Sequence, residues 1–297
     1  MTPVVFDLSA RIKIRVKGPD AFRFLNGQIT NNLQKATTKS AIQASLLTAK
    51  GKLSAHVFIS AESDGSFLLD ADPELGEALT PRIERYIIAD DVETEDVTDQ
   101  FSLFHVIVAA APEAPWIMRA VDSNRFGEPG FDLWLDRSQE ADARAQLSGS
   151  LGFAEVRDPE VFRIEQGIPR WGSELTGEII PIEANLEEAS IDYAKGCYLG
   201  QEVISRMKMS GQTNKRLRGL IAQENAPLRP GMQLWTEDEA AKEVGWVTSA
   251  TRSSRLGKEI ALAYVKRGFN NEGARLLARG ENDAAAIVAT VVPLPFG

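Results

Sequence analysis

The stretch Lys195-Gly196-Cys197-Tyr198-Leu199-Gly200-Gln201-Glu202 holds the only cysteine of the 297-residue chain. Cys197 stands between two glycines, Gly196 and Gly200, at a predicted turn that opens into a helix. Glycine tolerates positive φ and lets another backbone come close. Amide groups at the start of a helix favour a thiolate and lower the pKa of a thiol. Two interpretations follow: a reactive or ligand-facing thiol, and a buried cysteine that behaves as a small hydrophobic residue.

The composition, with 43% hydrophobic and 25% charged residues, is typical of a soluble globular protein. A chain of 297 residues is long enough for two or three domains. No apolar run approaches the roughly 18 residues of a membrane span, and residues 1–7 lack the features of a secretory signal. One cysteine excludes an internal disulfide and cannot alone build a zinc or iron–sulfur site. We therefore expect a cytoplasmic protein without a metal site.

The net charge of −9 argues against a general nucleic-acid-binding protein, because phosphates attract basic surfaces. The charge is nevertheless uneven along the chain. Residues 203–218 contain five cations and no acid, whereas residues 174–192 contain six acids. The basic strip 203–218 either holds an anionic ligand tail or is solvated surface charge, and the sequence leaves both interpretations open.

Helices and hairpins alternate before residue 216. Residues 11–16 alternate polar and apolar side chains, which predicts a half-buried strand, and Asp20 is placed to cap the helix that follows. Further strands are predicted over 41–49, 53–60, 67–70, 90–97, 101–110 and 131–135, and helices over 21–25, 72–87, 138–149 and 161–167. This order indicates α+β layers with antiparallel pairing.

The chain changes character from about Leu217, where glycine, proline and charged turns separate short β segments. These segments are 217–222, 232–236, 243–250, 259–265, 274–278 and 286–292. Such spacing predicts a small antiparallel barrel.

Two further places carry side chains suited to recognition. Residues 26–32 are rich in amides and hydroxyls, which both donate and accept hydrogen bonds. They suit the binding of a polar heterocycle, and they equally suit a helix end and loop. Glu165 lies near a predicted helix end, where the helix dipole disfavours an anion. Its partner is therefore either an arginine or the amino-pyrimidine edge of a ligand.

Residues 195–202 resemble the signature of the YgfZ family of folate-binding proteins, which are connected with iron–sulfur clusters. That family includes mitochondrial iron–sulfur assembly factors and is related to the glycine-cleavage T-protein, an aminomethyltransferase. Five more blocks resemble the family in its own order: 16–21, 25–31, 48–52, 163–169 and 181–186. The resemblance thus extends over most of the chain.

The resemblance implies two ferredoxin-like α+β units and a C-terminal β-barrel, arranged as the three-domain ring of the T-protein. Tetrahydrofolate would bind in the central channel of this ring. The first, folate-binding unit is expected to be discontinuous, over 1–45 and 150–215. The second ferredoxin-like unit is expected over 46–149, and the barrel over 216–297.

The resemblance also implies roles for individual residues. Glu165 corresponds to the T-protein glutamate that contacts the pterin, and Gln201 stands where the T-protein has an arginine. The expected folate-binding residues are Glu165, Asn26, Gln28, Trp171, Lys195, Tyr198, Gln201 and Arg206. Cys197 is expected to be a functional thiol, activated by its turn and by the cations Lys195 and Arg206.

The chain departs from the T-protein just after the hairpin turn at 50–52. The T-protein has an aspartate there, near the reacting folate nitrogen, whereas residues 53–56 contain no carboxylate. Aminomethyl transfer needs a negative charge beside its cationic centre, and loss of such a group slows a reaction by orders of magnitude. His56 is either a substitute base or a residue that packs on the sheet.

The leading hypothesis is a tetrahydrofolate-binding auxiliary protein that supports the assembly or repair of iron–sulfur enzymes, including those that modify tRNA. Its expected partners are folate and iron–sulfur client or assembly proteins, without stable nucleic-acid binding and without a membrane. Because a cluster needs several ligands, Cys197 would bind one only together with a second protein or a small thiol. The alternatives are a folate-dependent aminomethyltransferase and a tRNA-binding protein. The negative net charge disfavours the tRNA-binding protein.

Overall fold

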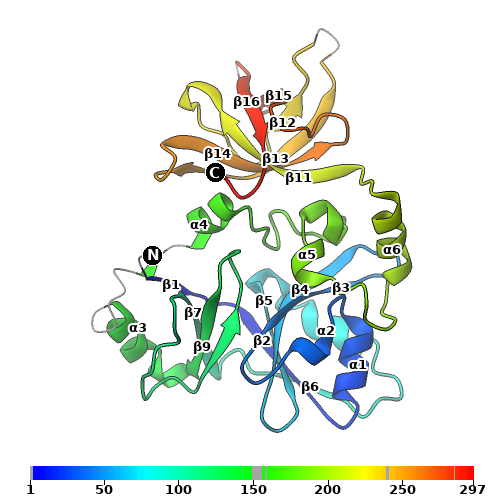
Figure 1. The fold of residues 1–297 in the computed structure, drawn as a ribbon, viewed down its shortest axis with the longest axis vertical. Coiled ribbons are helices and arrows are strands. Elements are labelled where there is room, and N and C mark those ends of the chain that lie inside the picture. The colour runs from blue at the N-terminus through cyan, green and yellow to red at the C-terminus, as the bar shows by residue number, and fades with distance from the viewer. Residues whose placement is uncertain (1–2, 149–155, 158, 239–240, 284) are drawn as a thin grey trace. The chain divides into compact units, whose positions relative to one another are not determined.

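The computed structural model describes residues 3–148, 156–157, 159–238, 241–283 and 285–297. The chain divides into two compact units (Figure 1). Unit 1 is formed by Met1–Pro159 and Glu187–Ser205, and unit 2 by Glu160–Leu186 and Arg206–Gly297. The chain therefore enters unit 2, returns to unit 1 for a short segment that includes Cys197, and leaves it again.

One sheet of unit 1 has five antiparallel strands in the order β3-β4-β5-β2-β6. These strands are β2 (Ile12–Lys17), β3 (Ile42–Leu47), β4 (Leu53–Ala61), β5 (Phe67–Ala71) and β6 (Glu93–Asp96). The structure confirms the predicted hairpin of β3 and β4, and it places the acidic strand β6 at an edge of the sheet. Residue 45, where a domain boundary was predicted, lies inside β3.

The other sheet of unit 1 has the order β10-β1-β7-β9-β8. Its strands are β1 (Val4–Asp7), β7 (Phe101–Ile107), β8 (Arg119–Ser123), β9 (Gly130–Asp136) and β10 (Val156–Arg157). β1 pairs in parallel with β10 and antiparallel with β7. The sequence did not predict β1, β8 and β10, which have four, five and two residues. The predicted boundary at 149/150 lies outside the described residues.

Ionic contacts in unit 1 join β5 of the first sheet to β9 of the second. The guanidinium of Arg125 donates to both carboxylate oxygens of Asp70, at 2.9 and 2.7 Å, and to Asp132 at 2.7 Å. Burial alone would raise the pKa of Asp132, but Arg125 and His105 hold it well below its usual range. Removing one partner of such a buried set typically costs about 3–5 kcal/mol.

One of the helices predicted in unit 1 is interrupted. The continuous helix predicted over 72–87 is wrong: the structure has η2 (Pro73–Leu75) and then α2 (Leu79–Glu84). Pro81 explains the break, because its ring clashes with the carbonyl group four residues earlier and it has no N–H to donate. The apolar side chains of Leu75, Leu79 and Ile83 are nevertheless buried, as their spacing predicted.

The other helices are α1 (Ala21–Gln28), η1 (Leu33–Lys35), η3 (Arg137–Gln139), α3 (Glu140–Ser148), α4 (Pro159–Gln166), η4 (Pro181–Ala184), α5 (Glu187–Ser190), α6 (Gln201–Ser210) and η5 (Gln223–Asn225). Asp20 precedes α1 as predicted, but its carboxylate accepts the amide of Asp91 and makes no side-chain cap to the helix. Gly167 ends α4 with φ of +71°, a conformation that favours glycine.

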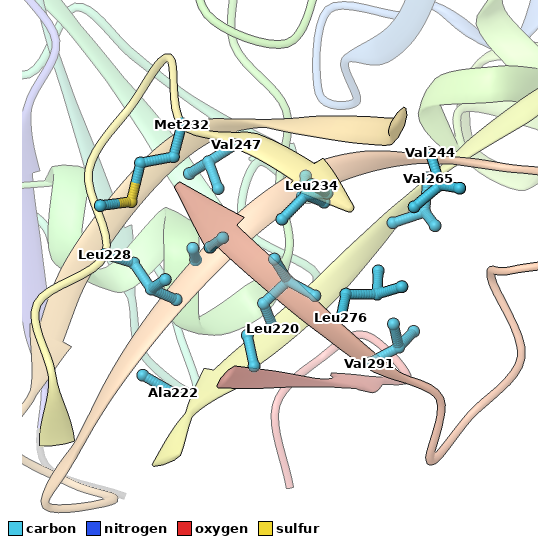
Figure 2. Packing of buried hydrophobic residues seen from close by; sticks show 14 residues of the cluster. Leu220, Ala222, Leu228, Met232, Leu234, Val244, Val247, Val265, Leu276 and Val291 are labelled. Atoms are coloured by element: carbon cyan, nitrogen blue, oxygen red, sulfur yellow. The ribbon is translucent and has the colours of Figure 1, made fainter. Parts of the chain in front are cut away.

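Unit 2 contains a closed six-stranded barrel in the order β11-β14-β13-β12-β15-β16. The strands are β11 (Lys215–Ala222), β12 (Gln233–Trp235), β13 (Glu243–Ser253), β14 (Lys258–Lys266), β15 (Arg275–Arg279) and β16 (Ile287–Val292). All six predicted segments are strands. Figure 2 shows the core of the barrel, where Leu220, Leu234, Leu276 and Val291 are among the buried side chains. Each such side chain contributes about 1.5–3 kcal/mol of hydrophobic stabilisation.

Candidate functional site

Cys197 lies in unit 1, in the turn before α6, and its side chain is exposed to solvent. The interpretation of this residue as a buried hydrophobic side chain is therefore wrong. Gly200 has φ of +84°, and a Cβ atom at this position would lie 2.7 Å from Thr48 O. A Cβ atom at Gly51 would lie 2.8 Å from the side chain of Val203. The two glycines thus let the cysteine turn and the β3–β4 hairpin turn approach each other closely.

Lys195 is buried and anchors the cysteine turn to the loop after α1. Its ammonium donates to three backbone carbonyls: Asn26 O at 2.6 Å, Ile29 O at 2.8 Å and Asn31 O at 2.6 Å. A cation is favourable at this place, because the carbonyls at the end of α1 carry partial negative charge. Burial lowers the pKa of Lys195 to about 8. Lys195 was predicted to bind folate, but its ammonium donates its three hydrogen bonds to backbone carbonyls.

Asn26 and Gln28 both lie at the end of α1, and their side chains are half-buried. The side-chain oxygen of Asn26 accepts the amide of Leu33 at 3.1 Å, and that of Gln28 accepts from Arg82 Nη1 at 3.1 Å. Arg82 also donates to Leu47 O at 2.8 Å, which links α1 to the β3–β4 hairpin. No pattern in the sequence predicts this role of Arg82.

Tyr198 and Gln201 follow Cys197 in the sequence, in the turn and at the start of α6. Tyr198 is buried, and its burial raises the pKa of the phenol to about 12. The Lys195 ammonium lies 5.3 Å from the centre of the Tyr198 ring. The backbone of the next residue, Leu199, donates to Gly27 O at 3.1 Å. Gln201 is half-buried and is the first residue of α6.

The structure therefore brings three of the family-like blocks together within unit 1: residues 25–31, 48–52 and 195–202. Their contacts are the Lys195 hydrogen bonds, the Leu199 amide and the close approach at Gly200. Six of the predicted site residues belong to this group: Asn26, Gln28, Lys195, Cys197, Tyr198 and Gln201. We call this group the cysteine-turn cluster.

The remaining predicted site residues, Glu165, Trp171 and Arg206, belong to unit 2. Arg206 is exposed on α6, and Trp171 is half-buried beside the short bridge that it makes to Leu175. The predicted activation of Cys197 by Lys195 and Arg206 stays a prediction.

Glu165 lies in the last turn of α4, and it is buried. The hydroxyl of Ser253 donates to one of its carboxylate oxygens, and Arg255 Nε lies 3.7 Å from the other. Its backbone carbonyl accepts the amide of Phe296 at 3.0 Å. The arginine partner, which the sequence left as one of two alternatives, is thus present. The partners Ser253 and Arg255 were missed because they lie in the barrel, about 90 positions later in the chain.

His56 lies in the stretch that lacks a carboxylate, and the structure buries it in β4. Its Nδ1 lies 3.3 Å from the hydroxyl of Ser45 on the neighbouring strand. Burial lowers the pKa of His56 to about 4, against an opposing effect of Asp72. The side chain packs in the sheet, so the second of its two interpretations is the one the structure supports.

No described helix is long and apolar enough to cross a membrane. Among the same residues, no group of three or more histidine, cysteine, aspartate and glutamate side chains is arranged to hold a metal ion.

Two family profiles match this sequence. The profile described as the GCVT N-terminal domain matches residues 2–126, and the glycine cleavage T-protein C-terminal barrel domain matches residues 215–296. A crystal structure of the glycine cleavage system aminomethyltransferase T from Bartonella henselae superimposes with a TM-score of 0.84. The match covers 100% of this chain and 86% of that chain at 20% sequence identity, and it shows a shared fold.

Similar sequences carry two different names. The mitochondrial iron–sulfur cluster assembly factor IBA57 homologue of Neurospora crassa is 29% identical over 71% of this chain and 52% of its own length. The aminomethyltransferase of Corynebacterium jeikeium is 27% identical over 91% of this chain and 80% of its own length. This chain thus spans about half of the length of the first relative and most of the second.

Proposed function

We propose a function for this chain from the premise that it belongs to the glycine cleavage T-protein family, whose two domains match residues 2–126 and 215–296. Within this family, the chain would act as an auxiliary protein in the assembly or repair of iron–sulfur enzymes, including enzymes that modify tRNA. It would bind tetrahydrofolate or a related reduced folate, with Cys197 as its functional thiol. Its partners would be iron–sulfur client or assembly proteins.

One observation carries this proposal: the exposed thiol of Cys197 stands on a turn that is held from two sides. Lys195 holds the turn through three carbonyls, and Gly200 holds it against Thr48. A solvent-accessible thiol in a fixed position is suited to exchange with a partner's thiol or to share a metal ion with it. The similarity of this chain to the Neurospora IBA57 homologue, which is named as an iron–sulfur cluster assembly factor, supports the proposed role.

The chemistry of the predicted folate-binding residues is compatible with a reduced folate. A carboxylate accepts about four hydrogen bonds; Ser253 donates one to Glu165, and Arg255 forms an ion pair with it at 3.7 Å. The amides of Asn26 and Gln28 use their oxygens within the protein, and an amide NH₂ group supplies two donors in addition. Bound folate would be recognised by hydrogen bonds to such groups, while its own ring nitrogens would supply any one-carbon chemistry.

The location of the protein stays a prediction. The cytoplasm was expected from the sequence, whereas the Neurospora relative is named as mitochondrial.

Replacement of the thiol tests the proposal. Cys197→Ala is expected to fold like the parent and to bind tetrahydrofolate with unchanged affinity by calorimetry. In cells whose own gene for this protein is deleted, the variant should fail to restore the activity of iron–sulfur enzymes. Ala194→Ser, a small polar change at an exposed position of the same turn, is the matched control. Full restoration by Cys197→Ala would remove the thiol from the mechanism.

An aminomethyltransferase is the second candidate, because the likeness to the Bartonella enzyme covers the whole chain and the Corynebacterium relative carries that name. The absence of a carboxylate in residues 53–56 and the burial of His56 speak against it. Incubation of the purified protein with an aminomethyl donor and tetrahydrofolate separates the two functions. Sustained turnover would establish the transferase, and binding of folate without turnover would favour the auxiliary role.

A further inference from the structure

The barrel of unit 2 carries a cavity of about 650 Å³ on its outer face. Its floor is formed by β12 and β15, on which Trp235 and Leu277 lie directly opposite each other. The residues next to them in sequence are buried in the barrel core: Leu234, Leu276 and Ala278. Trp235 and Leu277 are half-buried, line the cavity and do not belong to that core, so they face away from it. Small-molecule sites typically measure about 300–1,000 Å³, so the size of the cavity is that of a binding site.

The walls of the cavity combine small residues with charged ones. Gly231, Ala241, Gly280 and Ala286 leave room above the floor. Among the described residues, the charged members of the lining are Asp238, Glu281 and Arg279, which gives one excess negative charge. Arg279 directs its Nε toward the carbonyl of Asp283, at 3.4 Å, in the loop that follows β15. Asp238 and Glu281 are both exposed, so their carboxylates are accessible from solvent.

An aromatic floor beneath an acidic wall selects a particular kind of ligand. The face of a tryptophan attracts a cation more strongly than that of any other side chain, through the quadrupole of its ring. Two carboxylates attract the same charge, and they repel an anion. Leu277 and the small apolar residues of the wall favour a flat hydrocarbon surface over a hydrated metal ion.

We propose that this cavity binds a small organic cation with a flat aromatic body. The body stacks on Trp235 and Leu277, and the positive charge lies toward Asp238 and Glu281. All residues of the site belong to unit 2, and the site shares none of them with the predicted folate-binding residues or with Cys197. The proposal therefore stands or falls separately from the proposed function.

Titration of the full-length protein with proflavine, a planar aromatic cation, tests the proposal through the fluorescence anisotropy of the dye. We expect saturable binding that weakens as salt is added, because the carboxylates are exposed and screened. Trp235→Ala should weaken the affinity by about fivefold to tenfold, and the double variant Asp238→Asn/Glu281→Gln by about as much. Glu272→Gln, which removes an exposed carboxylate elsewhere on the barrel, is the matched control and should leave the affinity unchanged.

A planar aromatic anion, 8-anilinonaphthalene-1-sulfonate, completes the experiment and should bind more weakly than proflavine at low salt. The proposal is overturned if the anion binds more tightly than the cation, if neither dye shows saturable binding, or if Glu272→Gln weakens proflavine as much as the double variant does. Circular dichroism checks that Trp235→Ala retains the barrel. Asp238 and Glu281 are exposed, so their double variant keeps the test decisive even if Trp235→Ala does not fold.

Discussion

His56 shows how a residue that could have been a catalytic base is made part of a sheet. It is 7% exposed in β4, beside the hydroxyl of Ser45. Water cannot solvate an imidazolium at this position, and burial therefore lowers the pKa of His56 to about 4. The folded protein keeps the ring neutral at any pH at which a cell operates.

The stability of the protein should therefore depend on pH through His56. In the unfolded chain this histidine binds a proton below about pH 6.5, but in the folded protein it does so only below about pH 4. Between these values the unfolded state holds more protons, so the free energy of unfolding rises with pH. Acidification from pH 6.5 to 4 should remove up to about 3 kcal/mol through this group.

Urea denaturation of the parent protein and of His56→Gln over this pH range measures the effect. Loss of the packing of the ring changes the free energy of unfolding by the same amount at every pH. Loss of its titration makes the free energy of unfolding less dependent on pH. The difference between the two proteins should shrink as the pH falls from 6.5 to 4. Parallel pH profiles would show that His56 is protonated equally in both states.

The candidate site could be predicted from sequence as a set of blocks, but the contacts of its residues could not. Lys195 and Asn26 are 169 positions apart, and Glu165 and Ser253 are 88 positions apart. A lysine between a turn and a glycine looks like a ligand-binding cation when only its neighbours in sequence are known. Its actual partners are carbonyl groups, which every residue has and which therefore leave no trace in the sequence.

At the scale of elements, local patterns predicted strands better than they predicted helix continuity. The six barrel segments were predicted from short β stretches between glycine, proline and charged turns, and all six are present. The stripe of Leu75, Leu79 and Ile83 also predicted burial correctly, but Pro81 interrupts the helix that the stripe suggested. A hydrophobic period reports which face is buried, whereas backbone hydrogen bonding decides where a helix ends.

The two glycines of the cysteine turn should respond differently to substitution. Gly200→Ala places a Cβ atom 2.7 Å from Thr48 O at a φ of +84°, so it should lower the free energy of unfolding by about 1–3 kcal/mol. Gly196→Ala is the matched control, because a Cβ atom there has no other atom within 4 Å. It should change stability by less than about 0.5 kcal/mol.

Chemical denaturation of the two variants measures these stabilities, and the alkylation rate of Cys197 reports on the turn itself. We expect Gly200→Ala to alter that rate and Gly196→Ala to leave it close to that of the parent. Equal losses of stability in both variants would mean that the turn does not depend on its approach to the β3–β4 hairpin.

At the scale of the whole molecule, each unit has a hydrophobic core of its own. The barrel core includes Leu220, Leu234 and Val291, and unit 1 has clusters around Phe104 and Trp134. The sequence predicted the α+β architecture and the barrel. The domain boundaries at 45/46, 149/150 and 215/216 stay a prediction. Sequence periodicity shows which residues of an element are buried, but it does not show which sheets share a core.

A cavity in the barrel should therefore destabilise the barrel more than the sheets of unit 1. Leu234→Ala removes a fully buried side chain and should cost about 2–5 kcal/mol. Hydrogen exchange should then become faster in β11–β16, while the amides of β3, β4 and β5 keep the protection of the parent. Ile88→Ala, at a side chain that is 89% exposed, is the control and should leave exchange unchanged in both units. Equal acceleration everywhere would show that the molecule unfolds as one cooperative block.

The return of residues 187–205 to unit 1 has a consequence for biosynthesis. The carbonyl of Asn31 is synthesised 164 residues before Lys195, the lysine that donates a hydrogen bond to it. Throughout that interval the carbonyls of the loop after α1 can only be hydrated or shielded by a chaperone. A nascent chain that ends before Lys195 cannot form the hydrogen bonds that this lysine donates to the loop. A ribosome stalled before codon 195 would thus display an incomplete unit 1, however long its nascent chain had waited.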